Sequence, residues 1–139
     1  MNLNLQNQLK KILDDRFSQS ESTRANYARG EDTFDPVLSQ AVVFPETNEE
    51  VSQILKLCNE NKVPVVPFGT GTSLEGHAVG NDKGITISLE KMNKVLVVNT
   101  EDFDCRVQAC VTREQLNEYL REDGVFFPID PGANAAIGG

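Results

Sequence analysis

The sequence predicts an α+β fold. Short β-branched runs with the alternation of half-buried strands are interspersed with segments of helical hydrophobic period. Two capping signals of the form Thr-x-x-Glu/Gln mark helix starts within the chain. The 139 residues suffice for one domain with a hydrophobic core, and they contain no internal repeat. We therefore expect several strands and three helices.

The first helix is predicted over residues 4–17, where apolar side chains recur at helical spacing and form a stripe. Residues 18–35 are polar and rich in turn formers, which predicts an extended surface segment with little regular structure. We therefore divide the chain into an N-terminal helix with an extended segment, residues 1–40, and a main folded region, residues 41–139.

A βαβ-like unit opens the folded region. A strand over 41–45 ends at a proline, and Thr47 with Glu50 forms a capping box for a helix that runs to about Asn61. A second strand follows over 63–66. Strand, capped helix and strand in this order are typical of a βαβ unit.

The rest of the chain continues with strands and one helix. Apolar and polar residues alternate in further predicted strands over 84–89, 94–99 and 104–111. A second capping box at Thr112 opens the last helix, and Gly124 is predicted to end it as a left-handed C′ residue.

The loop after the second predicted strand, residues 67–77, is rich in glycine and small hydroxyl residues. Such a loop presents bare backbone N–H groups that converge on an anion, and a pyrophosphate is the anion that it suits best. The spacing excludes a Walker loop, because His77 stands where Lys is required, and a Rossmann fingerprint, because Leu74 replaces its third glycine. From the residues alone, the alternative is a plain connection between strands.

Charge and composition exclude several classes of function. The net charge of −8, from 21 acidic and 13 basic residues, disfavours nucleic-acid binding, and no apolar run approaches the roughly 20 residues of a membrane span. The N-terminus lacks the apolar core of a secretory signal. Three loosely spaced cysteines predict free thiols in a reducing compartment, so we expect a cytoplasmic location. With a single histidine, we expect no metal site.

Two segments resemble motifs of a known flavoprotein family. Residues 67–76, Pro-Phe-Gly-Thr-Gly-Thr-Ser-Leu-Glu-Gly, resemble the pyrophosphate loop of the FAD-binding domain of the vanillyl-alcohol oxidase / p-cresol methylhydroxylase superfamily. Residues 128–133, Pro-Ile-Asp-Pro-Gly-Ala, with Ile-Gly-Gly at 137–139, resemble its second flavin-contacting segment. The resemblance extends from about Val42 to the last residue. Both motifs are most similar to those of cytochrome-type D-lactate dehydrogenases and the glycolate oxidase D-subunit group.

The resemblance implies the first small subdomain of an FAD-binding domain, with its βαβ unit, and the start of a second subdomain, with an extended FAD held between them. It implies that backbone amides from Phe68 to Ser73 hold the pyrophosphate. It also places Gly76 and His77 near the ribityl chain or the ring. On the other wall it places Pro131, Gly132, Ala133, Ile137 and Gly138. The residues expected to bind FAD are Pro67, Phe68, Gly69, Thr70, Gly71, Thr72, Ser73, Gly76, His77, Pro131, Gly132, Ala133, Ile137 and Gly138.

Two positions depart from the family pattern. Thr72 stands where some members attach the flavin through a histidine, so the resemblance implies non-covalent FAD. Ala136 replaces a threonine that precedes Ile-Gly-Gly in many members, which removes one side-chain hydrogen bond to the cofactor. For His77, the alternative to a cofactor contact is an ordinary loop histidine with a satisfied hydrogen bond.

The activity implied by the resemblance is oxidation of a small 2-hydroxy acid, of the D-lactate or glycolate type, by hydride transfer to FAD. Catalytic groups of such enzymes come from a C-terminal cap domain, so we assign no catalytic residue. The Gly-Gly end predicts a fragment that is inactive alone and whose exposed apolar surface can drive self-association. The sequence does not determine the electron acceptor. The alternatives are a non-catalytic binding domain and a flavoprotein of the same fold with other chemistry.

Overall fold

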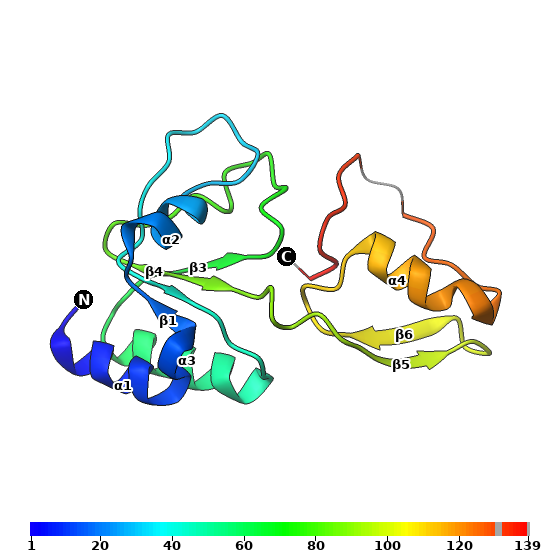
Figure 1. Cartoon of the computed structure of the whole chain (residues 1–139), viewed down its shortest axis with the longest axis horizontal. Coiled ribbons are helices and arrows are strands. Elements are labelled where there is room, and N and C mark those ends of the chain that lie inside the picture. Colours follow the sequence, from blue (N-terminus) through cyan, green and yellow to red (C-terminus); the bar gives the residue numbers. More distant parts are fainter. Residues whose placement is uncertain (130–131, 139) are drawn as a thin grey trace.

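The chain folds into two lobes that lie side by side (Figure 1). The structure is a computed structural model that describes residues 1–129 and 132–138. The N-terminal lobe contains α1 (Leu3–Leu13), a 3₁₀ turn (Asp14–Arg16), β1 (Phe17–Ser18), α2 (Glu21–Asn26), β2 (Val42–Val43), α3 (Asn48–Glu60), β3 (Val65–Phe68) and β4 (Ile85–Ser88). The C-terminal lobe contains β5 (Val95–Asn99), β6 (Asp104–Val107), α4 (Arg113–Leu120) and a 3₁₀ turn (Arg121–Asp123). This mixture of helix and sheet confirms the predicted α+β class.

The sheet of the N-terminal lobe has the strand order β1-β2-β4-β3. The strands β2, β4 and β3 are parallel, and β1 pairs antiparallel with β2. The predicted βαβ unit is present as β2, α3 and β3, but β4 lies between its two strands. Phe68 at the end of β3 pairs with Ser88 at the end of β4, so the loops that follow these strands emerge next to each other.

One face of this sheet is covered by α1 and α3 (Figure 1). Leu5, Leu9 and Leu13 of α1 are fully buried and share a core with Ile54 and Cys58 of α3. Burial raises the pKa of the Cys58 thiol to about 11, so this cysteine packs as a small apolar residue. No helix among the described residues combines the length and apolar character needed to cross a membrane.

Loops cover the opposite face of the sheet and are held there by hydrogen bonds. The side chain of Thr86 in β4 is fully buried, and its Oγ1 lies 2.8 Å from Ser39 Oγ. Ser39 Oγ also accepts a hydrogen bond from Asn81 N at 3.0 Å. The loops before β2 and before β4 are therefore anchored to the sheet and to each other.

Two N-terminal predictions are wrong in part. The helix predicted over 4–17 ends at Leu13, because the chain turns there so that Phe17 can enter β1 and pair with Val43. The segment after it is not wholly irregular, because α2 begins after Ser20, whose side chain caps the helix. The predicted extended character of residues 18–35 thus overlooked a short capped helix.

The predicted strand over 104–111 is too long, since β6 ends at Val107. The residues that follow leave the ladder with β5 and pair elsewhere. Cys110 N donates to a carbonyl of the linker between the lobes at 2.9 Å, and Ala109 O accepts from Gly138 N at 2.7 Å. This segment therefore joins the linker to the C-terminal residues instead of extending the sheet.

The helix α4 begins at the predicted capping position. Thr112 Oγ1 accepts a hydrogen bond from Gln115 N at 3.2 Å. The side chain of Gln115 does not complete a capping box but donates to Asn93 O at 2.7 Å. The predicted end at Gly124 is confirmed by its φ of 72°, which follows a last turn of 3₁₀ type.

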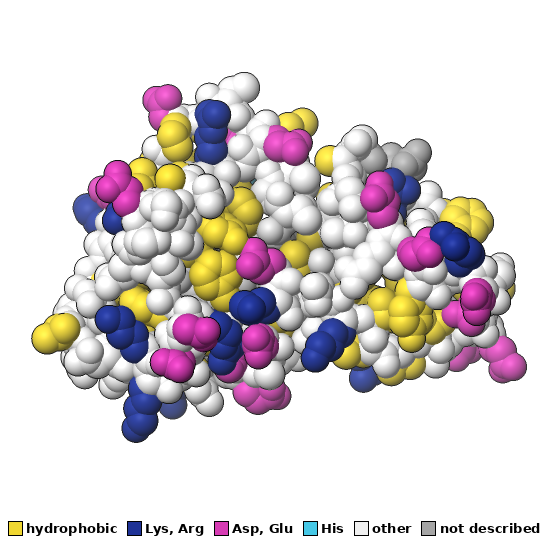
Figure 2. Space-filling view, in the orientation of Figure 1, with side chains coloured by type: hydrophobic (Ala, Val, Ile, Leu, Met, Phe, Trp, Pro, Cys, Tyr) yellow, Lys and Arg dark blue, Asp and Glu magenta, His cyan; other side chains and the backbone are white. Residues whose placement is uncertain are grey.

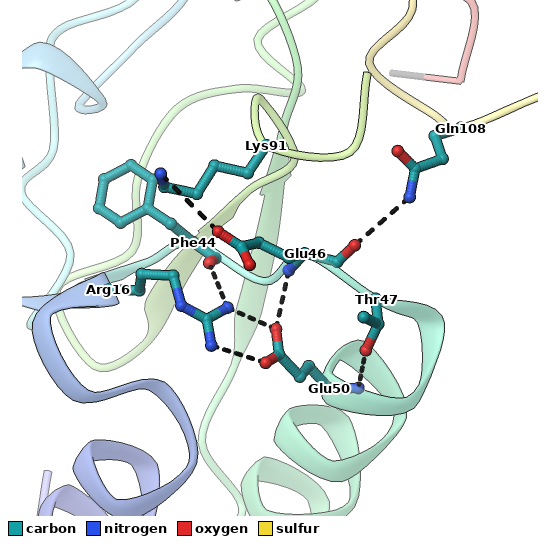
Figure 3. A network of polar contacts seen from close by, with 7 residues as sticks. All are labelled: Arg16, Phe44, Glu46, Thr47, Glu50, Lys91 and Gln108. Carbon is teal, nitrogen blue, oxygen red and sulfur yellow. Dashed lines mark hydrogen bonds and ion pairs between the residues drawn. The ribbon is translucent and has the colours of Figure 1, made fainter. Parts of the chain in front are cut away.

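An ion-pair network fastens the start of α3 to the 3₁₀ turn before β1 and to the C-terminal lobe (Figure 3). The guanidinium of Arg16 makes a bidentate pair with Glu50, with two distances of 2.6 Å. Glu50 also accepts from Glu46 N at 2.8 Å, and Glu46 O accepts from Gln108 Nε2 at 3.3 Å. Lys91 lies 3.9 Å from the Glu46 carboxylate. The hydrogen bonds from Arg16 hold the pKa of Glu50 below its usual value.

Removing the buried Leu9 side chain tests the packing of α1. Leu9→Ala should lower the free energy of unfolding by about 2–5 kcal/mol, because it leaves a cavity between α1 and the rest of the core. Leu3→Ala is the matched control, since Leu3 in the same helix is 71% exposed, and it should change stability by less than about 0.5 kcal/mol. Urea denaturation followed by circular dichroism measures both variants. Equal losses of stability in the two variants would contradict the packing of Leu9 in the core.

The ion pair predicts a pH-dependent stability. Because the folded-state pKa of Glu50 is lowered, the pair contributes stability that is present above the ordinary value of 4.5 and is lost as the pH falls through the folded-state value. Glu50→Gln should cost about 1–2 kcal/mol at neutral pH, and its difference from the wild type should shrink in acid. Urea denaturation at neutral and at acidic pH measures this difference in stability. Glu49→Gln, an exposed neighbour, is the control, and a difference that stays constant would contradict the assignment.

Candidate functional site

The loop after β3, the first residue after β4 and the C-terminal segment enclose a cavity of about 320 Å³. It lies at the carboxyl edge of the parallel strands, where ligands usually bind in such sheets. Its volume is in the range of small-molecule sites. The predicted residues that line it are Pro67, Gly69, Thr70, Gly71, Thr72, Ser73, His77 and Gly138. Two segments far apart in the sequence therefore meet at one site.

The backbone amides of residues 69–73, which we call the Gly loop, are available to a ligand. Within the described part of the chain, no group accepts a hydrogen bond from any of these five amides. Consecutive unpaired N–H groups in a glycine-rich loop form an anion-binding concavity. No helix occurs between β3 and β4, so no helix dipole adds to this field. The loop can therefore bind an anion through its amides alone.

Gly71 shows why the loop requires glycine. Its φ is 72°, and a Cβ at this position would lie 2.7 Å from the ring of Phe68. The Phe68 side chain does not line the cavity but is buried beneath the loop, with its ring edge-on to Tyr27 at a centroid distance of 4.9 Å. Phe68 thus supports the loop from below.

The C-terminal segment forms the opposite wall of the cavity. Ala136 N donates to Thr70 Oγ1 at 3.2 Å, so this wall is hydrogen-bonded directly to the Gly loop. A Cβ on Gly138 would lie 2.7 Å from the Cα of Ala109, which requires glycine where the segment passes the C-terminal lobe. Small residues therefore let the two walls approach each other.

Several predicted residues do not line this cavity. Gly76 has a φ of 76° and lies against the ring of Phe34. Ile137 faces a neighbouring hollow that Arg113 and Phe127 also line. The predicted residues outside the lining are Phe68, Gly76, Gly132, Ala133 and Ile137, while Pro131 lies outside the described residues. Their roles in cofactor binding stay predictions.

His77 lines the cavity, is exposed, and has a hydrogen-bond partner. Its Nδ1 lies 3.0 Å from Ser73 Oγ. His77 is therefore both a cavity residue and a hydrogen-bonded loop residue, and it restrains the chain just after the Gly loop. Within residues 1–129 and 132–138, no group of three or more His, Cys, Asp or Glu side chains is placed to hold a metal ion.

Three lining residues were not among those expected to bind FAD: Ala78, Leu89 and Ala136. Leu89 directly follows β4, and residues just beyond a parallel strand are site candidates on general grounds. The position of Leu89 after a predicted strand was visible in the sequence. The sequence did not show that β4 pairs with β3, which brings Leu89 beside the Gly loop.

A half-buried tyrosine, Tyr27, lies behind the Gly loop. The hydroxyl of Tyr27 donates to Glu90 Oε2 at 2.5 Å. Burial, and then this hydrogen bond, raise the pKa of Tyr27 to about 12, so it stays a neutral donor at physiological pH. Its ring packs between Phe68 and Phe44 in edge-to-face geometry. Tyr27 thereby links the N-terminal segment to the turn that leads into the second lobe.

The fold and the site define a two-lobed α+β domain in which a glycine loop with unpaired amides lines a cavity. Among solved structures, alkyldihydroxyacetonephosphate synthase matches with a TM-score of 0.89 and 21% identity over 99% of this chain and 28% of its own. p-Cresol methylhydroxylase with substrate bound matches with a TM-score of 0.73 and 22% identity over 100% of this chain and 29% of its own. At these identities the likeness shows a shared fold.

The chain belongs to the FAD binding domain family, whose model matches residues 39–139. The predicted flavoprotein family and its cofactor, FAD, are thereby confirmed. The unpaired amides of the Gly loop fit this cofactor, because its pyrophosphate is the anion that such a loop binds.

The curated relatives are longer proteins. The mitochondrial D-lactate dehydrogenase [cytochrome] of Arabidopsis thaliana is 43% identical over 134 residues, which are 95% of this chain and 24% of that protein. D-lactate dehydrogenase [cytochrome] 1, mitochondrial, of Saccharomyces cerevisiae is 50% identical over 70% of this chain and 17% of its own. Glycolate oxidase subunit GlcD of Bacillus subtilis is 30% identical over 90% of this chain and 27% of its own. The chain thus spans about a quarter or less of these relatives.

The hydrogen bond between the two walls can be tested without a ligand. Thr70→Val removes the hydroxyl that accepts from Ala136 N, so amide exchange at Ala136 should accelerate by about threefold to tenfold. Hydrogen exchange measured by NMR reports it. Thr100→Val, at an exposed turn of the other lobe, is the control and should leave that rate unchanged. Unaltered protection in Thr70→Val would show that this bond does not hold the wall.

Proposed function

We propose that this chain binds FAD non-covalently, with the pyrophosphate on the amides of the Gly loop. The observation that supports the proposal is the set of five unpaired amides at residues 69–73, all of which line the cavity between the two walls. Thr72 lies within the loop and carries a hydroxyl instead of a nucleophilic ring nitrogen, which supports non-covalent binding. Ala136 and Gly138 on the opposite wall are small residues, so a flat ring has room beside them.

We further propose that the complete protein oxidises a small 2-hydroxy acid of the D-lactate or glycolate type. The names of relatives that are 30–50% identical support this substrate class. Bound FAD supplies a hydride acceptor. Residues 1–129 and 132–138 supply the cofactor site, and we assign none of them as a catalytic residue. In this proposal the chain provides a cofactor-binding portion, and groups beyond it bind the substrate and remove its proton.

The surface of the C-terminal lobe supports a proposal of self-association for the isolated chain. Leu96, Phe103 and Phe126 are 52%, 86% and 73% exposed. Figure 2 shows apolar side chains emerging between charged ones on this lobe. Apolar surface of this kind favours burial against another surface.

A cytoplasmic location also stays a prediction, since the Arabidopsis and yeast relatives are named as mitochondrial.

The cofactor proposal is tested on the product of the complete open reading frame that encodes residues 1–139. The purified protein should be yellow and should release FAD on acid denaturation, and it should reduce an artificial acceptor dye with D-lactate or glycolate. Absence of flavin would overturn the proposal. Flavin that stays attached to the denatured chain would overturn its non-covalent part.

Two glycine variants separate cofactor binding from backbone strain. Gly71→Ala and Gly124→Ala each force alanine into a φ of 72°, at a cost of about 1 kcal/mol from the backbone alone. Only Gly71 lies in the Gly loop, so Gly71→Ala should lower FAD affinity by at least about tenfold while Gly124→Ala should not. Fluorescence titration of the apoprotein with FAD measures the difference. Equal affinities would contradict the assigned loop.

A further inference from the structure

The segment of residues 27–34, which precedes the range matched by the family, lies against the Gly loop. Glu31 N donates a hydrogen bond to Gly71 O at 2.8 Å. A Cβ on Gly30 would lie 2.5 Å from Gly71 O and 3.2 Å from Ser73 O, so the backbones are in close contact here. Neither Gly30 nor Glu31 lines the cavity. The segment therefore supports the loop without itself facing the ligand.

This contact controls the direction of an amide. In a trans peptide, the carbonyl and the N–H of the same unit point in opposite directions. Gly71 O points toward Glu31, so the N–H of Thr72, in the same peptide unit, points away from the segment. Thr72 lines the cavity, and its amide has no partner among the described residues. The hydrogen bond from Glu31 thus fixes the direction of the Thr72 amide, which belongs to a residue that lines the cavity.

The segment is itself held in place by several contacts. The carboxylate of Asp32, only 8% exposed, accepts from Gly30 N at 3.1 Å and from Phe34 N at 3.0 Å. At its start, Tyr27 is anchored by the hydrogen bond to Glu90. A support that is ordered by its own hydrogen bonds and anchored at its start can impose a conformation on the loop that it touches.

We propose that Gly30 and the backbone amide of Glu31 are positioning groups for the cofactor's pyrophosphate. They hold the Gly71–Thr72 peptide so that its N–H faces the phosphate. Gly30 is required because any side chain would push the Gly71 carbonyl away. A loop without a helix behind it has no helical hydrogen bonds to orient its amides, so a neighbouring segment supplies that order. The inference rests on the proposed binding of FAD.

Three variants test the inference in the product of the complete open reading frame. Glu31→Pro removes the amide donor, and Glu31→Ala keeps it while removing the exposed side chain. Gly30→Ala keeps both amides and displaces the Gly71 carbonyl, and it carries no penalty from a positive φ. We expect FAD to bind at least about tenfold more weakly to Gly30→Ala and Glu31→Pro, and as in the wild type to Glu31→Ala.

Two readouts distinguish positioning from a general loss of structure. Thermal unfolding of the apoproteins identifies any variant that fails to fold. If Glu31→Pro fails to fold, Gly30→Ala still tests the inference. The ³¹P resonances of bound FAD should shift in Gly30→Ala, because the donor to one phosphate has moved. Wild-type affinity and unshifted resonances in a folded Gly30→Ala protein would overturn the inference. A wild-type protein that binds no FAD would overturn the proposed function itself.

Discussion

The parallel pairing of β3 with β4 is the interaction on which the site depends. It places Phe68 opposite Ser88, so the chain leaves both strands at one edge of the sheet, and Leu89 comes to lie beside the Gly loop. Parallel neighbours require a crossover connection, and here residues 69–84 cross without a helix. The backbone groups of the crossover therefore lack helical partners and must find others. In the Gly loop the carbonyl of Gly71 finds one, while the amides stay available.

The two lobes have separate apolar cores and are joined by polar contacts. One cluster is built on α1, α3 and the four-stranded sheet, and the other is built on α4 with the residues of β5 and β6 that face it. Between them run the hydrogen bonds from Gln108 to Glu46 and from Ala136 to Thr70. Interfaces of this kind permit relative motion of the parts they join. A ligand that contacts both walls of the cavity would therefore stabilise the arrangement of the lobes by mass action.

Local signals predicted most of the structure that a residue and its near neighbours in the chain decide, although the short helix α2, capped by Ser20, was overlooked. Thr47 and Thr112 cap their helices, and Gly124 takes the left-handed conformation expected of it. Prediction failed where a distant partner decides. The first helix stops early because Phe17 pairs with Val43, and β6 stops early because the residues after it bond to the linker and to the C-terminal segment. No pattern within those segments reports such partners.

The sequence by itself determined that residues 67–77 are a loop rich in glycine and small hydroxyl residues and that the chain has flavoprotein motifs, because both are properties of consecutive residues. Only the tertiary structure decided which segments meet at that loop. Ala136 and Gly138 face it from the C-terminal end, and Gly30 supports it from the N-terminal end. The physical reason is that these contacts depend on the insertion of β4 between β2 and β3. That pairing is non-local, and residue spacing along the chain carries no signal for it.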